Sequence, residues 1–236
     1  MAEYLTDEDQ VERLKRWAKT YGSAVLTGLL VALIAYFGWS YWQKTQYAEQ
    51  SIASAEYQQL QDAYTATEQA PDDTALKTEF LSAADRLVKS NPDSVYAFHS
   101  LLLQARAAMD REDYPAATQA LQKAAAQKIG DAGLTQLAQL RLARVQAQQD
   151  QLDAALASIA KVTDPAFVPS AQELKGDLLF QKNQLEPAKA AYQAAWDALA
   201  KREEPRELLR VKMEAIGMTV KEISVDSPLI DDGAPS

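Results

Sequence analysis

The strongest constraint on this chain is a long uncharged stretch near its N-terminus. No charged residue lies between Lys19 and Lys44, and residues 21–42 read YGSAVLTGLLVALIAYFGWSYW. At about 1.5 Å of rise per residue, a helix over residues 21–42 would span roughly 33 Å, close to the bilayer's hydrocarbon core of about 30 Å. The stretch is therefore predicted to be a transmembrane helix that contacts the lipid bilayer.

Aromatic residues at both ends of the stretch support this prediction. Trp17 and Tyr21 lie before the apolar centre, and a second group follows it: Tyr36, Phe37, Trp39, Tyr41 and Trp42. Such amphipathic rings prefer the headgroup level. Soluble helices rarely keep every face apolar over this length, and the apolar region of a cleaved signal peptide covers only about 7–15 residues. We therefore expect an uncleaved anchor.

Basic residues near the two ends predict the orientation of the anchor. Four precede it, Arg13, Lys15, Arg16 and Lys19, whereas only Lys44 follows it before Lys77. Because basic residues favour the cytoplasmic side, residues 1–20 are predicted to be a short cytoplasmic segment. The expected location is the bacterial inner membrane, with a single pass and a periplasmic C-terminal domain.

Small residues form a stripe along the predicted span. Ala24, Gly28 and Ala32 fall at i, i+4 and i+8, so they share one face of a helix. Such a face lets another transmembrane helix approach closely, although ordinary lipid-facing composition explains it equally well.

Residues 43–218 are predicted to be all-α. Turn signals such as Glu112-Asp113, Asp150-Gln151 and Asn183-Gln184 separate segments of helical periodicity. A pattern of small and large residues recurs after 38 residues and again after 33, in Ala117–Leu121–Ala124, Ala155–Ile159–Val162 and Ala188–Tyr192–Ala195. This pattern resembles the tetratricopeptide repeat and predicts an α-solenoid of about three to four helix pairs. A non-repeating helical bundle is the alternative.

A solenoid of this kind has a concave groove that can hold a peptide or a helix. By the groove positions of the repeat family, the candidate partner-binding residues are His99, Leu102, Arg106, Met109, Leu137, Leu140, Arg144, Glu173, Asp177 and Phe180. For each of them, packing or solvation is an equally good explanation.

Local signals predict how the C-terminal part is organised. Ser170 and Glu173 have the spacing of a helix capping box. Residues 206–218 are predicted to form a closing helix with Pro205 in its first turn. Residues 219–236 lack sustained periodicity and are predicted to be a mostly disordered tail.

Composition argues against several functions. The net charge of −9 disfavours nucleic-acid binding, because an acidic domain repels phosphate backbones. Cysteine is absent and His99 is the only histidine, so the sequence predicts no metal site. Phosphate-binding glycine motifs are absent as well. We therefore expect no cofactor, no catalytic residues and no enzyme activity.

Several segments resemble one family, the YfgM-type ancillary subunit of the SecYEG translocon. They are Asp9-Gln10-Val11-Glu12, Lys15-Arg16, Gly38-Trp39, Tyr41-Trp42, Leu140–Gln146 and Asp153–Leu156. The resemblance covers roughly residues 5–218. It implies an inner-membrane protein whose periplasmic repeat domain associates with the translocon. It also implies two kinds of partner, a PpiD-type membrane-anchored chaperone and unfolded translocating chains.

The leading hypothesis is thus a non-enzymatic adaptor that links emerging chains to periplasmic chaperones. A second hypothesis is a membrane-anchored scaffold for envelope assembly or division. A third is a regulator whose cytoplasmic segment sequesters a signalling protein.

Overall fold

The computed structural model describes residues 7–223 of the chain and, within them, all side chains except those of residues 7–10, 14, 24 and 46–50. The described residues form helices and connecting segments, without strands. The helices are α1 (Asp7–Gln69), α2 (Thr74–Ser90), α3 (Val95–Met109), α4 (Tyr114–Ala126), α5 (Ala132–Gln148), α6 (Leu152–Ile159), α7 (Val168–Gln181), α8 (Leu185–Ala200) and α9 (Glu207–Ala215). The all-α prediction is confirmed.

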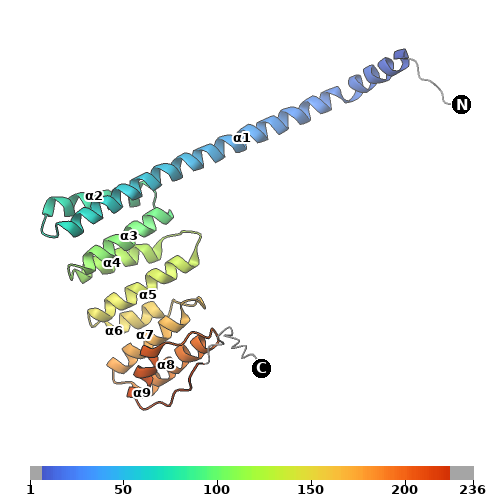
Figure 1. Cartoon of the computed structure of the whole chain (residues 1–236). Coiled ribbons are helices and arrows are strands. Elements are labelled where there is room, and N and C mark those ends of the chain that lie inside the picture. The colour runs from blue at the N-terminus through green and yellow to red at the C-terminus, as the bar shows by residue number, and fades with distance from the viewer. Residues whose placement is uncertain (1–6, 224–236) are drawn as a thin grey trace, which may run out of the picture. The chain divides into compact units, whose positions relative to one another are not determined.

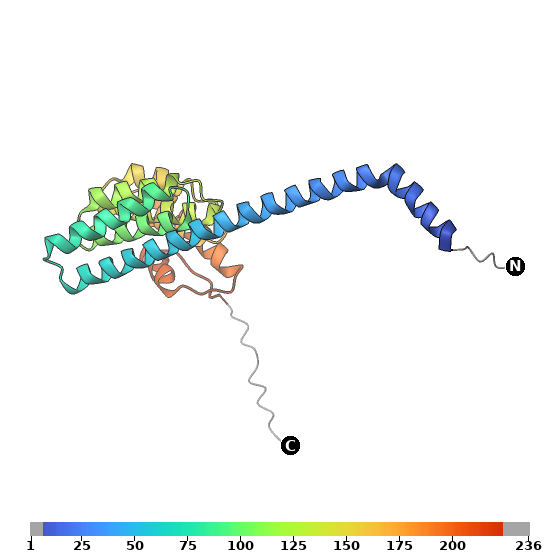
Figure 2. The ribbon, with the colours of Figure 1, turned by 90° about the horizontal axis from the view of Figure 1, so that it is seen from above.

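The chain divides into two compact units, with the boundary between Ala55 and Glu56. Helix α1 contributes to both, because its last residues, from Glu56 to Gln69, belong to the second unit. In that unit, helices α2 to α9 follow one another in chain order along a stack (Figure 1). In the view from above, the successive helix pairs overlap (Figure 2). The prediction of an α-solenoid built from helix pairs is therefore confirmed.

The turn inside each of three successive pairs has the same backbone conformation. Glu112, Asp150 and Asn183 have φ values of 58° each, in the left-handed region. In each case the next residue's N–H donates to a carbonyl five residues back, as in Asp113 to Ala108. This is the Schellman closure of a helix end. The three left-handed residues lie 38 and 33 residues apart, the spacing that the small-residue pattern predicts.

The small residues of the pattern lie between packed helices. Ala117, Ala155 and Ala188 are fully buried, and so are Ala124 and Ala195. Three core clusters follow one another along the stack: one shared by α3, α4 and α5, one by α5, α6 and α7, and one by α7, α8 and α9. Each pair thus buries its apolar face against its neighbours.

One local prediction in this region is wrong, and one repeat copy has a short second helix. Helix α6 ends at Ile159, so Val162 lies in the turn that follows and not on the helix. Ser170 and Glu173 do not form a capping box, because α7 begins at Val168 with Pro169 in its first turn and no side-chain cap.

The closing helix α9 is shorter than predicted. It runs from Glu207 to Ala215, and Gly217, with φ of 79°, follows its end. Pro205 lies outside the helix, before its N-cap Arg206. After α9 the chain packs back on the last core cluster through Met218, Val220 and Ile223. Residues 219–223 of the predicted tail therefore lie against the domain, and residues 224–236 lie outside the described residues.

Candidate interaction surfaces and the membrane-spanning segment

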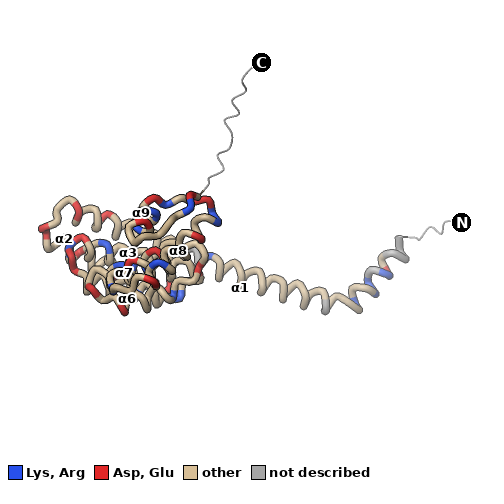
Figure 3. The backbone as a smooth tube through the Cα atoms, turned by 90° about the horizontal axis from the view of Figure 1, so that it is seen from below, with Lys and Arg blue, Asp and Glu red and all other residues tan. Residues whose placement is uncertain are grey.

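The first unit contains one helical stretch long and apolar enough to cross a membrane. It is Val25–Thr45, with a mean hydropathy of 1.5 and none of its window buried. The predicted span, residues 21–42, overlaps it with a shift of a few residues. Within this stretch Lys44, next to its end, is the one charged residue, and Figure 3 shows most of this part of α1 without the acidic and basic residues that are frequent in the second unit. Exposed apolar side chains of this kind need a covering, and the length matches a bilayer.

The small residues on this helix are partly described. Gly28 has nothing within 4 Å of the place where a Cβ would stand, and Ala32 is exposed. The side chain of Ala24 lies outside the described residues. The contact with a second transmembrane helix stays a prediction.

The structure separates the predicted groove residues into three groups. Leu102 and Leu140 are buried in core clusters, only 8% and 4% exposed, so they are packing residues and cannot meet a partner. Glu173 and Asp177 belong to an ion-pair network. The other six remain accessible to different degrees: His99, Met109 and Leu137 are half-buried, whereas Arg106, Arg144 and Phe180 are exposed.

Arg106 and His99 belong to a seam between the end of α1 and α3 that contains several aromatic rings. The Tyr57 ring centroid lies 5.9 Å from that of Tyr96 and 6.1 Å from that of His99. Further along, the Arg106 guanidinium lies 5.7 Å from the Tyr64 ring centroid. The sequence prediction missed Tyr57 and Tyr64, because a helix that continues from the membrane segment shows no separate repeat signal.

Charged groups surround the hydroxyl of Tyr64. It donates to Asp110 Oδ2 at 3.2 Å, and Arg106 approaches Glu68 at 3.6 Å. Burial, the hydrogen bond with Glu68 and the charge of Asp110 raise the pKa of Tyr64 to about 12. The seam thus combines aromatic surface with carboxylates.

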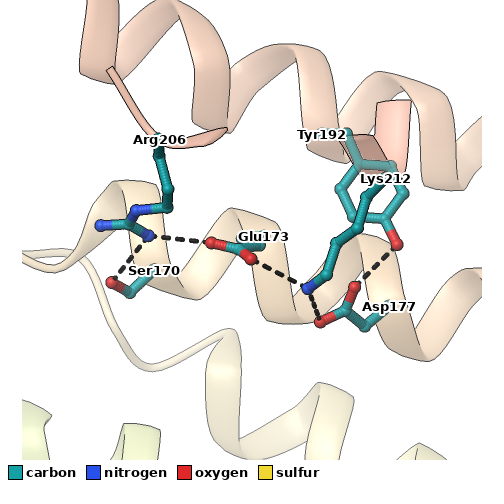
Figure 4. Close-up of polar contacts among 6 residues, drawn as sticks. All are labelled: Ser170, Glu173, Asp177, Tyr192, Arg206 and Lys212. Carbon is teal, nitrogen blue, oxygen red and sulfur yellow. Dashed lines mark hydrogen bonds and ion pairs between the residues drawn. The ribbon is translucent and has the colours of Figure 1, made fainter. Parts of the chain in front are cut away.

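Glu173 lies at the centre of the network that attaches α9 to α7 (Figure 4). Arg206 Nη1 donates to Glu173 Oε2 at 2.8 Å, and Lys212 Nζ donates to Glu173 Oε1 at 2.9 Å. Lys212 also donates to Asp177 Oδ2 at 2.8 Å, and the Tyr192 hydroxyl donates to Asp177 Oδ1 at 2.7 Å. The two acids predicted to line a groove therefore hold the closing helix in place.

The network shifts the pKa values of its members. Burial alone would raise the pKa of Glu173, but the hydrogen bonds from Lys212 and Arg206 outweigh it and lower that pKa below its ordinary value. Burial would likewise lower the pKa of Lys212, but its bonds to Asp177 and Glu173 raise that pKa. Both shifts favour the charged forms, as expected of a structural ion pair.

Within residues whose side chains are described, no three His, Asp or Glu side chains group closely enough to hold a metal ion. The groups with shifted pKa values near Glu173 all have partners inside the domain, so the geometry fits attachment of α9.

Comparison with known proteins places this architecture in a family. A sequence model described as a tetratricopeptide repeat-like domain matches residues 15–218. The ancillary SecYEG translocon subunit of Aggregatibacter actinomycetemcomitans is 34% identical over 195 residues, which cover 83% of this chain and 91% of the relative. The chain belongs to the ancillary SecYEG translocon subunit family.

Further relatives carry the same name. The ancillary SecYEG translocon subunit of Haemophilus influenzae is 31% identical over 83% of this chain and 91% of its own length. The one from Escherichia coli is 31% identical over 81% of this chain and 87% of its own length. No solved structure matches the chain. Family membership and the apolar helix are consistent with a single-pass inner-membrane protein.

Proposed function

We propose that this chain is a non-enzymatic accessory subunit of the SecYEG translocon. The observation that carries the proposal is the identity of 34% over 91% of a relative that bears this name. The exposed apolar segment Val25–Thr45 supports it, because a translocon subunit needs an anchor next to the channel. A repeat domain attached to such an anchor acts at high effective concentration where chains leave the channel.

Co-purification tests the association. The tagged full-length chain, extracted in mild detergent, is expected to retain SecY in amounts comparable to the chain itself. A single-pass inner-membrane protein of similar abundance serves as control. Good recovery of the chain without SecY would contradict the proposal.

The orientation is the second part of the proposal. The basic residues Arg13, Lys15, Arg16 and Lys19 support a cytoplasmic N-terminus, and the repeat domain then lies in the periplasm. Alkaline phosphatase fused after Ser236 is expected to be active, because that enzyme matures only outside the cytoplasm. Activity confined to a cytoplasmic reporter at the same place would reverse the orientation.

The third part is the role of the domain as an adaptor. The accessible residues Arg106, Arg144 and Phe180 lie on α3, α5 and α7, the first helices of three successive pairs, where a solenoid can hold an extended chain. The partners proposed are translocating chains and a PpiD-type membrane-anchored chaperone. Photocrosslinkers at these positions should capture both. Crosslinks to envelope-assembly or division proteins instead would favour the scaffold hypothesis.

A further inference from the structure

The two ends of the repeat stack differ in how they are covered. At the C-terminal end, α9 lies over the last pair and buries Leu209 and Met213 completely. Arg206 and Lys212 bind the carboxylates of the helix beneath. The covering helix therefore presents two buried apolar residues with i, i+4 spacing, Leu209 and Met213. Its N-cap Arg206 and its Lys212 form ion pairs with acidic residues of α7. Terminal repeats require a cover of this kind, because their outer face has no neighbour.

At the N-terminal end, the pair formed by Glu56–Gln69 of α1 and by α2 carries an open groove of about 390 Å³. Its floor is made of small and apolar side chains, Ala63, Ala83 and Leu76, and its rim carries Asp62, Glu79 and Arg86. Only residues of α1 and α2 border it. On α2, Ala84 is fully buried, and its carbonyl accepts a hydrogen bond from Ser100 of α3 at 3.3 Å, so α3 covers this part of α2.

The first helix pair, which carries this groove, has a negative net charge. Residues 56–90 contain seven acidic residues, Glu56, Asp62, Glu68, Asp72, Asp73, Glu79 and Asp85, against three basic ones, Lys77, Arg86 and Lys89. Asp62 and Glu79 form no ion pair with any residue whose side chain is described. A second copy docked on this face in a two-fold arrangement would place two acidic surfaces against each other, which is unfavourable.

We propose that this groove binds a helix of another protein, one that presents a small or apolar i, i+4 pair flanked by Lys or Arg. Alanines in the floor allow the close approach of a helix. Basic flanks complement Asp62 and Glu79, as Arg206 and Lys212 complement Glu173 and Asp177 at the other end of the stack. This inference deepens the adaptor role proposed above. It depends on that role only for the place where the partner meets this chain.

Site-specific photocrosslinking in the full-length chain tests the proposal in intact cells. A photoreactive residue replaces Ala63 or Ala83, and Gln119, exposed on α4, serves as control position. Both groove positions are expected to crosslink to the same protein, within a helical segment that carries Lys or Arg. A crosslink to a second copy, to a segment without basic residues, or to no protein would overturn the proposal.

Charge reversal provides the second arm. Asp62→Lys with Glu79→Lys is expected to reduce the groove crosslink by about tenfold, because two attractive pairs become repulsive. The control Glu204→Lys with Glu222→Lys makes the same change of charge at exposed positions elsewhere. An unchanged crosslink in the groove variant would overturn the proposal. If that variant proves unstable by thermal unfolding, Ala83→Trp, which fills the floor without a change of charge, replaces it and is expected to abolish the crosslink from Ala63.

SecY co-purification is measured on the same variants. If a groove variant loses the crosslink but still retains SecY, binding in the groove is separate from association with the translocon. A chain that never retains SecY but still crosslinks a basic helix would reject the proposed function and leave the groove's partner intact.

Discussion

At the scale of the residue, Gly176 shows how closely two helices of a pair approach. A Cβ at this position would lie 2.5 Å from two ring atoms of Tyr192, closer than carbon atoms pack. The ring cannot move aside freely, because Tyr192 is buried and its hydroxyl is held by Asp177. Glycine is therefore required here by space and not by backbone conformation.

Gly176→Ala is expected to lower the free energy of unfolding by about 1–3 kcal/mol, the usual cost of overpacking a core. Thermal or denaturant unfolding of the detergent-solubilised full chain, followed by circular dichroism, measures it. Gly130→Ala is the matched control, because nothing lies within 4 Å of its Cβ position. Equal effects of the two substitutions would contradict the packing argument.

Glu173→Gln is expected to lower the stability at pH 7 by about 1–3 kcal/mol, because two cations lose their common carboxylate. The folded-state pKa of Glu173 is depressed, so its contribution is present above the ordinary pKa of glutamate, about 4.3, and is lost as the pH falls through the folded value. The difference between wild type and variant should shrink between pH 7 and pH 3. A difference that stays constant would exclude the charged carboxylate as its cause. Glu186→Gln, exposed on α8, should change little.

At the scale of the element, α9 is attached by few side chains. Leu209 and Met213 are fully buried, whereas Leu208 and Val211 on the same helix are 62% and 49% exposed. Attachment of the helix therefore depends on one face and on the ion pairs of Arg206 and Lys212.

Leu209→Ala or Met213→Ala is expected to cost about 2–5 kcal/mol and to release α9 from α8. Hydrogen exchange followed by mass spectrometry should show lost protection in α9 and residues 216–223 before the helices of the first pairs. Leu208→Ala, a change on the exposed face, should stay within about 0.5 kcal/mol of wild type. Uniform loss of protection along the whole stack would show that α9 does not open separately.

Sequence patterns predicted the elements better than their contacts. The spacing of Ala117, Ala155 and Ala188 predicted the repeated turns, because small residues and turn signals are local. From the local sequence, Glu173 is predicted to be part of a helix capping box. Its actual partners, Arg206 and Lys212, lie 33 and 39 residues further along the chain, so no local pattern could indicate them. Leu102 and Leu140 appeared to line a groove because helical periodicity alone does not distinguish two adjacent faces.

At the scale of the whole molecule, one chain combines an apolar helix with a repeat domain that has two different ends. The apolar stretch Val25–Thr45 has no protein cover in its unit, and α9 covers only the C-terminal end of the stack. The proposed role depends on both features.

Leu30→Arg with Ile34→Arg is expected to prevent membrane integration, because each arginine at the centre of a span costs roughly 2.5–3.5 kcal/mol. Extraction with alkaline carbonate measures it: the wild type should stay in the pellet and the variant should move to the supernatant. Gln119→Arg with Ala190→Arg adds the same charge to exposed positions of the repeat domain and should leave the chain in the pellet. Retention of the Leu30→Arg, Ile34→Arg variant would argue against this stretch as the anchor.

The segment that returns after α9 also gives the domain an intrinsic optical reporter. The indole N–H of Trp196 donates to the carbonyl of Lys221 at 3.1 Å, and the other three tryptophans of the chain, Trp17, Trp39 and Trp42, all belong to the first unit. With those three replaced by Phe, emission would come from one indole only. A red shift of that emission would then show that the segment after α9 has detached from Trp196, in real time and without a label.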